Sequence, residues 1–192
     1  MPGTWRRLSQ RNRKKMRIAI VGAGPLGRKL ALAAARAGYE VLLEDVMPSN
    51  LHHAQEYLRQ ELGPAALPSV RFVSTIEEAV RDADLAIDCV PDELESKLEI
   101  FCLLDRMSPP RTVLMSPMKN VSIADLASCT YRAERCVAVV ADAKELADSS
   151  LKQIRLRTPQ QVTGASVRLV QEFWERLGFS VAISCDETVL GG

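Results

Sequence analysis

A buried strand that runs directly into a glycine-rich turn and a helix constrains this chain more than any other feature. Residues 17–24 read RIAIVGAG, and an Ala- and Leu-rich segment follows the turn. The apolar run predicts a buried strand. Pro25 near the start and Gly38 just past the end are typical of a helix over 25–37. The stretch therefore predicts the first strand, turn and helix of an α/β protein.

The same alternation of β-rich runs and helical patterns continues almost to the end of the chain. Continuous apolar strands between helices indicate a parallel sheet that is buried on both faces. We therefore predict an α/β fold with a doubly wound, mostly parallel sheet in a single domain. The expected strands cover 17–21, 39–44, 70–74, 84–90, 112–116, 136–141, 152–157 and 179–184, and the main expected helices cover 25–37, 49–62, 92–107, 122–127 and 163–177.

Two of the expected helices carry specific side-chain patterns. A short acidic helix follows Thr75, and Glu78 lies three residues later, which is the spacing of a capping box. The helix over 92–107 is expected to turn one apolar face toward the sheet. That face comprises Leu94, Leu98, Phe101 and Leu104.

The glycines of the first turn fit the pattern G-x-G-x-x-G. Gly22 permits the tight turn, Gly24 leaves room for a pyrophosphate, and Gly27 lets the helix pack closely on the strand. The helix N-terminus offers unpaired N–H groups to the phosphates. Because the pattern follows a strand and opens a helix, it predicts a dinucleotide-binding Rossmann domain. The predicted phosphate loop consists of Gly22, Ala23, Gly24, Pro25, Leu26 and Gly27.

Two acidic residues end the second expected strand. An acid at this position accepts hydrogen bonds from the adenosine ribose and repels a 2′-phosphate, so NAD is favoured over NADP. Asp45 and Glu44 both lie there, and only one of them needs to face the ribose. We predict that these two residues contribute to an NAD site.

Length, charge and cysteine content exclude several other classes of protein. The 192 residues suit one domain, and the net charge of +1 gives no preference for nucleic acid or a membrane surface. No apolar stretch approaches the roughly 20 residues of a membrane span. The five cysteines include no C-x-x-C pair, which indicates free thiols in a reducing cytoplasm and no metal site. We expect a cytoplasmic protein in which residues 17–192 form one domain after a basic, disordered extension over 1–16.

Two long stretches resemble a known family. They read RIAIVGAGPLGRKLALAAARAGYEVLLED and ADLAIDCVPDELESKLEIFCLLDRMSPPRTVLMS. They resemble the NAD-binding domain of the L-3-hydroxyacyl-CoA dehydrogenases, and a weaker likeness extends over residues 16–186. The resemblance implies NAD(H) as the cofactor and an acyl-CoA as the substrate, which that family oxidises or reduces at the 3-position.

The resemblance adds cofactor residues after the fourth expected strand. The family has an acid there and, about one helical turn later, a lysine near the cofactor. Asp92 and Lys97 fall on these places, and Val90 at the strand end is expected to contact the cofactor as well. Without the resemblance, Lys97 is more simply interpreted as a solvated helix lysine.

The family's catalytic residues do not carry over. In place of the substrate-polarising serine after the fifth strand, this chain has Lys119. In place of the catalytic histidine it has Val140, and in place of the glutamate that orients this histidine it has Arg155. Its only histidines, His52 and His53, follow the second strand at the adenosine end. Because hydride transfer to a ketone needs a proton donor within hydrogen-bond reach, Lys119 is the remaining catalytic candidate.

Lys119 has two interpretations. A lysine acts as an acid or base when burial or a neighbouring cation lowers its pKa. The sequence indicates no carboxylate that must lie beside Lys119 and no closing domain that would exclude water. The same lysine is equally consistent with a role in neutralising cofactor phosphates, or with simple solvation.

Three hypotheses follow. The first is an NAD(H)-binding protein related to 3-hydroxyacyl-CoA dehydrogenase without family-type catalysis, which acts as a pseudoenzyme, a sensor or a subunit of a complex. The second is an active oxidoreductase of that type that uses Lys119 or residues from a partner chain. The third is an interaction module with a vestigial nucleotide site. Because the family's dimer-forming helical domain has no counterpart here, we also expect a homo-oligomer or a larger complex.

Overall fold

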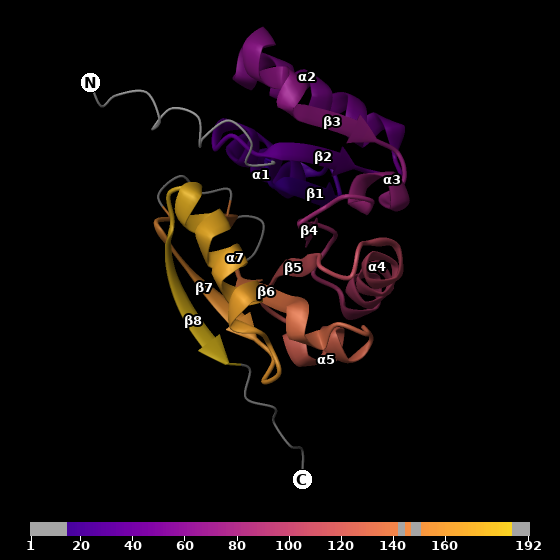
Figure 1. Cartoon of the computed structure of the whole chain (residues 1–192). Coiled ribbons are helices and arrows are strands. Elements are labelled where there is room, and N and C mark those ends of the chain that lie inside the picture. The colour runs from indigo at the N-terminus through magenta and orange to yellow at the C-terminus, as the bar shows by residue number, and fades with distance from the viewer. Residues whose placement is uncertain (1–14, 142–144, 147–150, 186–192) are drawn as a thin grey trace, which may run out of the picture.

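The computed structural model of the chain describes residues 15–141, 145–146 and 151–185. Its strands form one sheet in the order β3-β2-β1-β4-β5-β6-β7-β8, with helices on both faces (Figure 1). The order reverses between β1 and β4, as in doubly wound folds. The predicted fold class is confirmed. The predicted extension over 1–16 lies outside the described residues except for its last two positions.

The elements follow the expected alternation closely. The strands are β1 (Arg17–Val21), β2 (Glu40–Glu44), β3 (Val70–Val73), β4 (Leu85–Asp88), β5 (Val113–Met118), β6 (Cys136–Val140), β7 (Gln153–Thr158) and β8 (Ser180–Cys185). The helices are α1 (Pro25–Arg36), α2 (Pro48–Ala66), α3 (Ile76–Val80), α4 (Leu94–Met107), α5 (Ile123–Ser128) and α7 (Gly164–Arg176), with short 3₁₀ turns η2 (Leu67–Ser69) and η3 (Ala133–Arg135).

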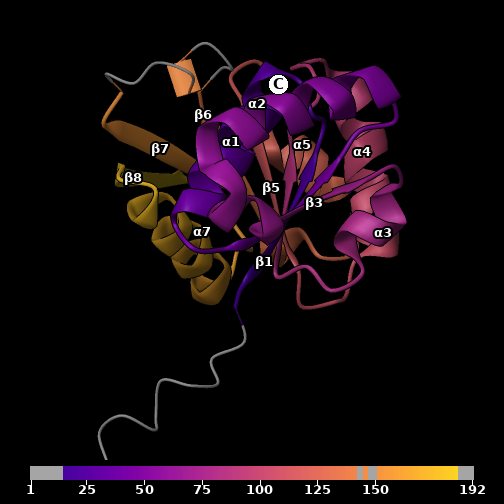
Figure 2. The same ribbon diagram turned by 90° about the horizontal axis from the view of Figure 1, so that it is seen from above.

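Successive strand residues point to opposite faces of the sheet and build two cores. On one face, Ile18 and Ile20 of β1 pack in a cluster with residues of α1, α2 and α7. On the other face, Ala19 and Val21 pack in a cluster with residues of α3, α4 and α5. Figure 2 shows α7 and α4 on opposite sides of the sheet. Both cores need apolar side chains, which explains why the central strands are continuously hydrophobic.

The last part of the sheet reverses direction. Strands β1 to β6 are parallel, whereas β7 runs antiparallel to β6 and β8 runs parallel to β7. The β7–α7–β8 segment is a helical crossover of the kind that joins parallel strands. It places α7 against β5, β6 and β8, where Phe173 and Trp174 are fully buried.

Two sequence-based details need correction. The fifth strand continues through Pro117 to Met118 instead of ending at Ser116. Pro117 is tolerated because pairing with β4 stops at Met115, so its missing N–H is not needed on that side. Leu94 was expected on the apolar face of α4, but it is 47% exposed because it begins the helix at the edge of the sheet.

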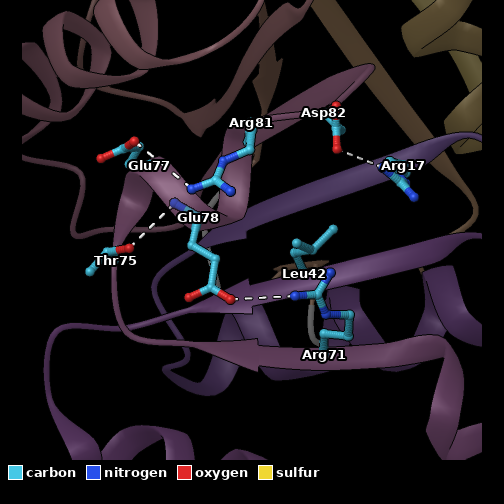
Figure 3. Close-up of a pocket in the computed structure, with 8 residues that line it drawn as sticks. All are labelled: Arg17, Leu42, Arg71, Thr75, Glu77, Glu78, Arg81 and Asp82. Carbon is cyan, nitrogen blue, oxygen red and sulfur yellow. Dashed lines mark hydrogen bonds and ion pairs between the residues drawn. The ribbon is translucent and has the colours of Figure 1, made fainter.

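The capping box before α3 is only half formed. The Thr75 hydroxyl accepts a hydrogen bond from the Glu78 backbone N–H at 3.3 Å, as predicted. The Glu78 carboxylate, however, contacts Arg71 on β3 at 3.3 Å (Figure 3). The Glu78 carboxylate therefore pairs with Arg71 on β3 and not with the backbone N–H at the start of α3.

Candidate dinucleotide-binding site

The glycine-rich turn lies between β1 and α1 at the carboxyl edge of the sheet. Gly22 has a φ of +101°, and its N–H donates to the Glu44 carbonyl at 2.8 Å. A Cβ atom on Gly27 would lie 1.7 Å from the Gly22 carbonyl oxygen, so only glycine permits this approach of helix to strand. A Cβ atom on Gly24 would meet no heavy atom within 4 Å. The turn thus leaves open space at the position where the sequence predicts a pyrophosphate.

A cavity of about 410 Å³ opens beside this turn. It brings together residues from the glycine turn, the starts of α1 and α2, the connections that follow β2 and β4, β5 and the residue after β6. Of the predicted cofactor residues, most line it directly, whereas Ala23 and Gly27 are packed behind its wall. The lining comprises Gly22, Gly24, Pro25, Leu26, Asp45, Asn50, Cys89, Val90, Pro91, Asp92, Pro117 and Ala141.

The Asp45 carboxylate ties the second strand to the glycine turn. Its Oδ2 accepts hydrogen bonds from the Ala23 N–H at 2.8 Å and from the Asn50 side-chain amide at 3.1 Å. Its Oδ1 accepts one from the Met47 N–H at 2.8 Å. A carboxylate offers about four lone-pair sites. Asp45 therefore retains capacity to accept a hydrogen bond from a ribose hydroxyl at the cavity wall.

Glu44 faces a second, smaller cavity of about 130 Å³. The side chain is 4% exposed. Burial, together with the negative charge of Asp45, raises the pKa of Glu44 to about 7. Apart from the two acids and Gly22, the lining is aliphatic: Val21, Val46, Ile76, Val90 and Ile100. Asp45 thus lines both cavities and is the acid whose carboxylate is bonded to the turn, whereas Glu44 lines the smaller cavity.

Asp92 organises the loop that follows β5. Its Oδ2 accepts hydrogen bonds from the Lys119 N–H at 2.9 Å and from the Asn120 N–H at 3.2 Å. Its Oδ1 is buried and has no hydrogen-bond partner among the residues that the structure describes. A buried carboxylate oxygen without a donor is costly. Since Asp92 also lines the larger cavity, this oxygen suits a hydroxyl or amide donor on a bound cofactor.

Lys97 lies beneath the site instead of in its lining. Its ammonium is fully buried and donates to Asp88 Oδ2 at 3.1 Å, to Ser116 Oγ at 2.8 Å and to the Val90 carbonyl at 3.4 Å. Asp88 Oδ1 in turn accepts the Val90 N–H at 2.9 Å. The interpretation of Lys97 as a solvated lysine is wrong. Lys97 and Asp88 together hold the Val90 backbone in place from the interior of the protein, and Val90 lines both cavities.

The three positions aligned with the family's catalytic residues meet at one corner of the sheet. Lys119 directly follows β5, whose last residue, Met118, pairs with Val140 on β6. The antiparallel register of β6 and β7 places Arg155 opposite Val140 when it is continued by one residue. Val140 and Arg155 both line a cavity of about 250 Å³ that adjoins the dinucleotide cavity at Ala141.

Glu145 is the residue at this corner that the sequence reasoning missed. Its carboxylate forms an ion pair with the Lys119 ammonium at 2.5 Å. Glu145 follows β6, and β6 is the neighbour of β5, so the two strand ends meet at the same edge. Strand order would have revealed this pairing, whereas proximity along the chain did not.

The described residues fit NAD on structural grounds alone. They provide a turn with open space at Gly24, a ribose acceptor in Asp45, and an unpaired buried oxygen in Asp92. The aliphatic cavity beside Glu44 suits a flat heterocycle. Hydroxyls, phosphates and a base occur together in a dinucleotide.

Comparison with known proteins agrees with this geometry. Residues 17–140 match the family model described as 3-hydroxyacyl-CoA dehydrogenase, NAD binding domain. A probable 3-hydroxybutyryl-CoA dehydrogenase from Bacillus subtilis is 30% identical over 133 residues, a match that covers 62% of this chain and 46% of that protein. A 3-hydroxybutyryl-CoA dehydrogenase from Bradyrhizobium diazoefficiens is 26% identical over 184 residues, a match that covers 88% of this chain and 61% of that protein.

The solved structures give the same result for the fold. An (S)-3-hydroxybutyryl-CoA dehydrogenase from Ralstonia eutropha superposes with a TM-score of 0.80 at 18% identity, covering 91% of this chain and 65% of that one. At this level of identity the likeness establishes the fold. The chain spans about half the length of the curated relatives it matches.

Proposed function

The chain belongs to the 3-hydroxyacyl-CoA dehydrogenase family through its NAD-binding domain, and from this premise we propose that it binds NAD(H) without carrying out the family's reaction on its own. NAD is the cofactor of this domain. The proposal therefore concerns the chemistry that the bound cofactor can and cannot undergo in this chain.

One observation carries the proposal: an intact cofactor cavity adjoins a corner where Val140 and Arg155 stand in place of the family's catalytic histidine and its orienting glutamate. Val140 has no titratable group, and Arg155 opposite it is a permanent cation. Neither can donate a proton to a ketone and take it back. No histidine is among the described residues that line this corner, and His52 lies on α2, where it contacts Glu56.

Residues of this chain account for the binding of NAD(H). NAD, when bound, supplies the hydride donor or acceptor. We assign the glycine turn to the pyrophosphate, Asp45 to the adenosine ribose, and Asp92 to a hydroxyl or amide near the nicotinamide end. Lys97 acts from below by fixing the Val90 segment. The adenine ring is assigned to the aliphatic cavity beside Glu44.

The ion pair of Lys119 and Glu145 favours a second candidate function. A lysine ammonium held by a carboxylate at the edge of the cofactor cavity is a proton donor with a partner in place. The side chains are 36% and 43% exposed, so water is not excluded from the pair. In this alternative, either Lys119 protonates the substrate carbonyl, or a partner chain covers the corner and supplies the missing catalytic residues. The substrate is then an acyl-CoA or another small molecule.

An assay with acetoacetyl-CoA and NADH separates the two candidates. We expect calorimetry to show NADH binding, and absorbance at 340 nm to show no consumption above the rate without protein. Turnover that is abolished by Lys119→Ala and by Glu145→Gln would establish the second candidate in place of the first. Turnover that requires a co-purifying protein would identify a site shared between chains.

Location and assembly are also proposals. None of the helices in the described part of the chain is long and apolar enough to cross a membrane. We propose a cytoplasmic protein that self-associates through β8. This strand forms one edge of the sheet and carries neither charge nor proline, and its Ile183 is 50% exposed. Uncharged edge strands pair readily, and a two-fold axis would join two copies of β8.

A further inference from the structure

The small cavity beside Glu44 adjoins the cofactor cavity and differs from it in character. Both cavities are lined by Gly22, Asp45 and Val90, so the two meet beside the Asp45 carboxylate and the glycine turn. Its walls are aliphatic side chains from β1, α3, α4 and the β2–α2 connection. Such walls stack well on a flat base but provide no hydrogen bonds.

Glu44 supplies the hydrogen-bonding group in these aliphatic walls. No hydrogen bond within the described part of the chain engages its carboxyl, although the side chain is only 4% exposed. Burial and the charge of Asp45 raise the pKa of Glu44 to about 7. An ionised acid in this setting lacks the hydrogen bonds that would offset its desolvation.

The other charged groups near this cavity are engaged elsewhere. On α4, Glu95 and Glu99 are exposed to solvent. Other charged side chains on the neighbouring elements form ion pairs: Arg71 with Glu78, Arg81 with Glu77, Lys97 with Asp88, and Asp105 with Arg132. Figure 3 shows the α3 pairs around a separate hollow of about 390 Å³. Asp45 is thus the charge that acts on Glu44.

We propose that Glu44 recognises adenine as a neutral carboxylic acid, so that dinucleotide binding takes up one proton. The inference rests on the proposed function. With the ribose at Asp45, the glycosidic nitrogen lies at the cavity mouth and the opposite N1/N6 edge of adenine points inward. That edge presents a ring-nitrogen acceptor beside an amino donor, and a neutral carboxyl presents the matching O–H donor and carbonyl acceptor. An ionised carboxylate only accepts hydrogen bonds, so it leaves N1 facing a negative charge.

Calorimetric titration of the full chain with NADH between pH 6 and pH 9 tests the proposal. Above pH 7, we expect the dissociation constant to rise by up to about tenfold per pH unit, the limit for one coupled proton. Titrations at pH 8 in buffers of different ionisation enthalpy should report uptake of nearly one proton. Glu44→Gln keeps a donor and an acceptor, so this variant should bind NADH with a constant that does not change with pH.

The 1-deazaadenine analogue of NADH is the matched probe, since it carries a C–H group in place of the N1 acceptor and keeps the N6 amino donor. A carboxylate can accept the N6–H without facing a lone pair at position 1, so binding of this analogue should weaken much less with pH. A flat NADH profile in the wild type would overturn the proposal. Equal weakening of both dinucleotides would overturn base recognition, because charge alone would then explain the proton. Failure of wild type and Glu44→Gln to bind either dinucleotide at any pH would instead overturn the proposed function.

Discussion

The carboxyl groups of two adjacent acids at the end of β2 lie in very different environments. Asp45 accepts three hydrogen bonds, whereas Glu44 lies in aliphatic surroundings and its pKa rises from 4.5 to about 7. As pH rises, the unfolded chain ionises Glu44 first, so the free energy of unfolding falls between about pH 4.5 and pH 7 and then levels off.

A substitution at Glu44 makes this cost measurable. Urea unfolding at pH 5 and pH 8 should show that the wild type loses about 2–3 kcal/mol more than Glu44→Gln over this interval. Asp45→Asn serves as the comparison, since it should lower stability and keep most of that pH dependence, because burial raises the pKa of Glu44 more than the charge of Asp45 does. Parallel pH profiles for wild type and Glu44→Gln would show that the glutamate is solvated in both states.

Two glycines of the turn should respond differently to substitution, one through the stability of the fold and the other through NADH binding. Gly27→Ala places a Cβ atom 1.7 Å from the Gly22 carbonyl, so we expect a loss of about 1–3 kcal/mol or more in thermal or urea unfolding. Gly24→Ala meets no protein atom within 4 Å and should retain the wild-type melting temperature. It should nevertheless bind NADH at least about tenfold more weakly, because the methyl group occupies the pyrophosphate's approach. Wild-type affinity in Gly24→Ala would place the phosphates elsewhere.

At the scale of elements, the buried lysine of α4 joins the ends of two strands, β4 and β5. Lys97→Met leaves the Asp88 carboxylate buried without its cation, and we expect a loss of about 3–5 kcal/mol in the free energy of unfolding. The double variant Asp88→Asn with Lys97→Met removes both charges and should recover most of that loss. A single variant as stable as wild type would mean that Asp88 is already neutral in the folded protein.

The elements also show which features the sequence could predict and which it could not. Hydrophobic periodicity, helix caps and turn residues predicted nearly every strand and helix, because each of these patterns depends on residues within a few positions along the chain. The pairing of Lys119 with Glu145 and the burial of Lys97 depend on which strands are adjacent. A lysine at a helical surface position and one in a buried network have the same local sequence, so only the resemblance indicated that Lys97 belongs to the site.

For the whole molecule, β8 forms an edge of the sheet among the described strands, and this edge predicts assembly. Size-exclusion chromatography with light scattering should give a mass above the 21.2 kDa of one chain. Ile183→Lys adds a charge to the uncharged edge and should shift the population to monomer without changing NADH affinity, since the strand lies far along the sheet from the glycine turn. Tyr131→Lys, a change at a residue that is 98% exposed and lies outside β8, is the control. A monomeric wild type would reject the β8 interface.

The central claim is that this chain holds NAD(H) at an intact site while Val140 and Arg155, in place of the family's histidine and glutamate, leave the neighbouring corner without family-type catalysis. The most direct test saturates the purified chain with NADH, verifies binding by nicotinamide fluorescence, and adds excess acetoacetyl-CoA while absorbance at 340 nm is followed. The account predicts a stable signal that decays no faster than in the absence of protein. Stoichiometric or catalytic oxidation of the bound NADH would contradict it.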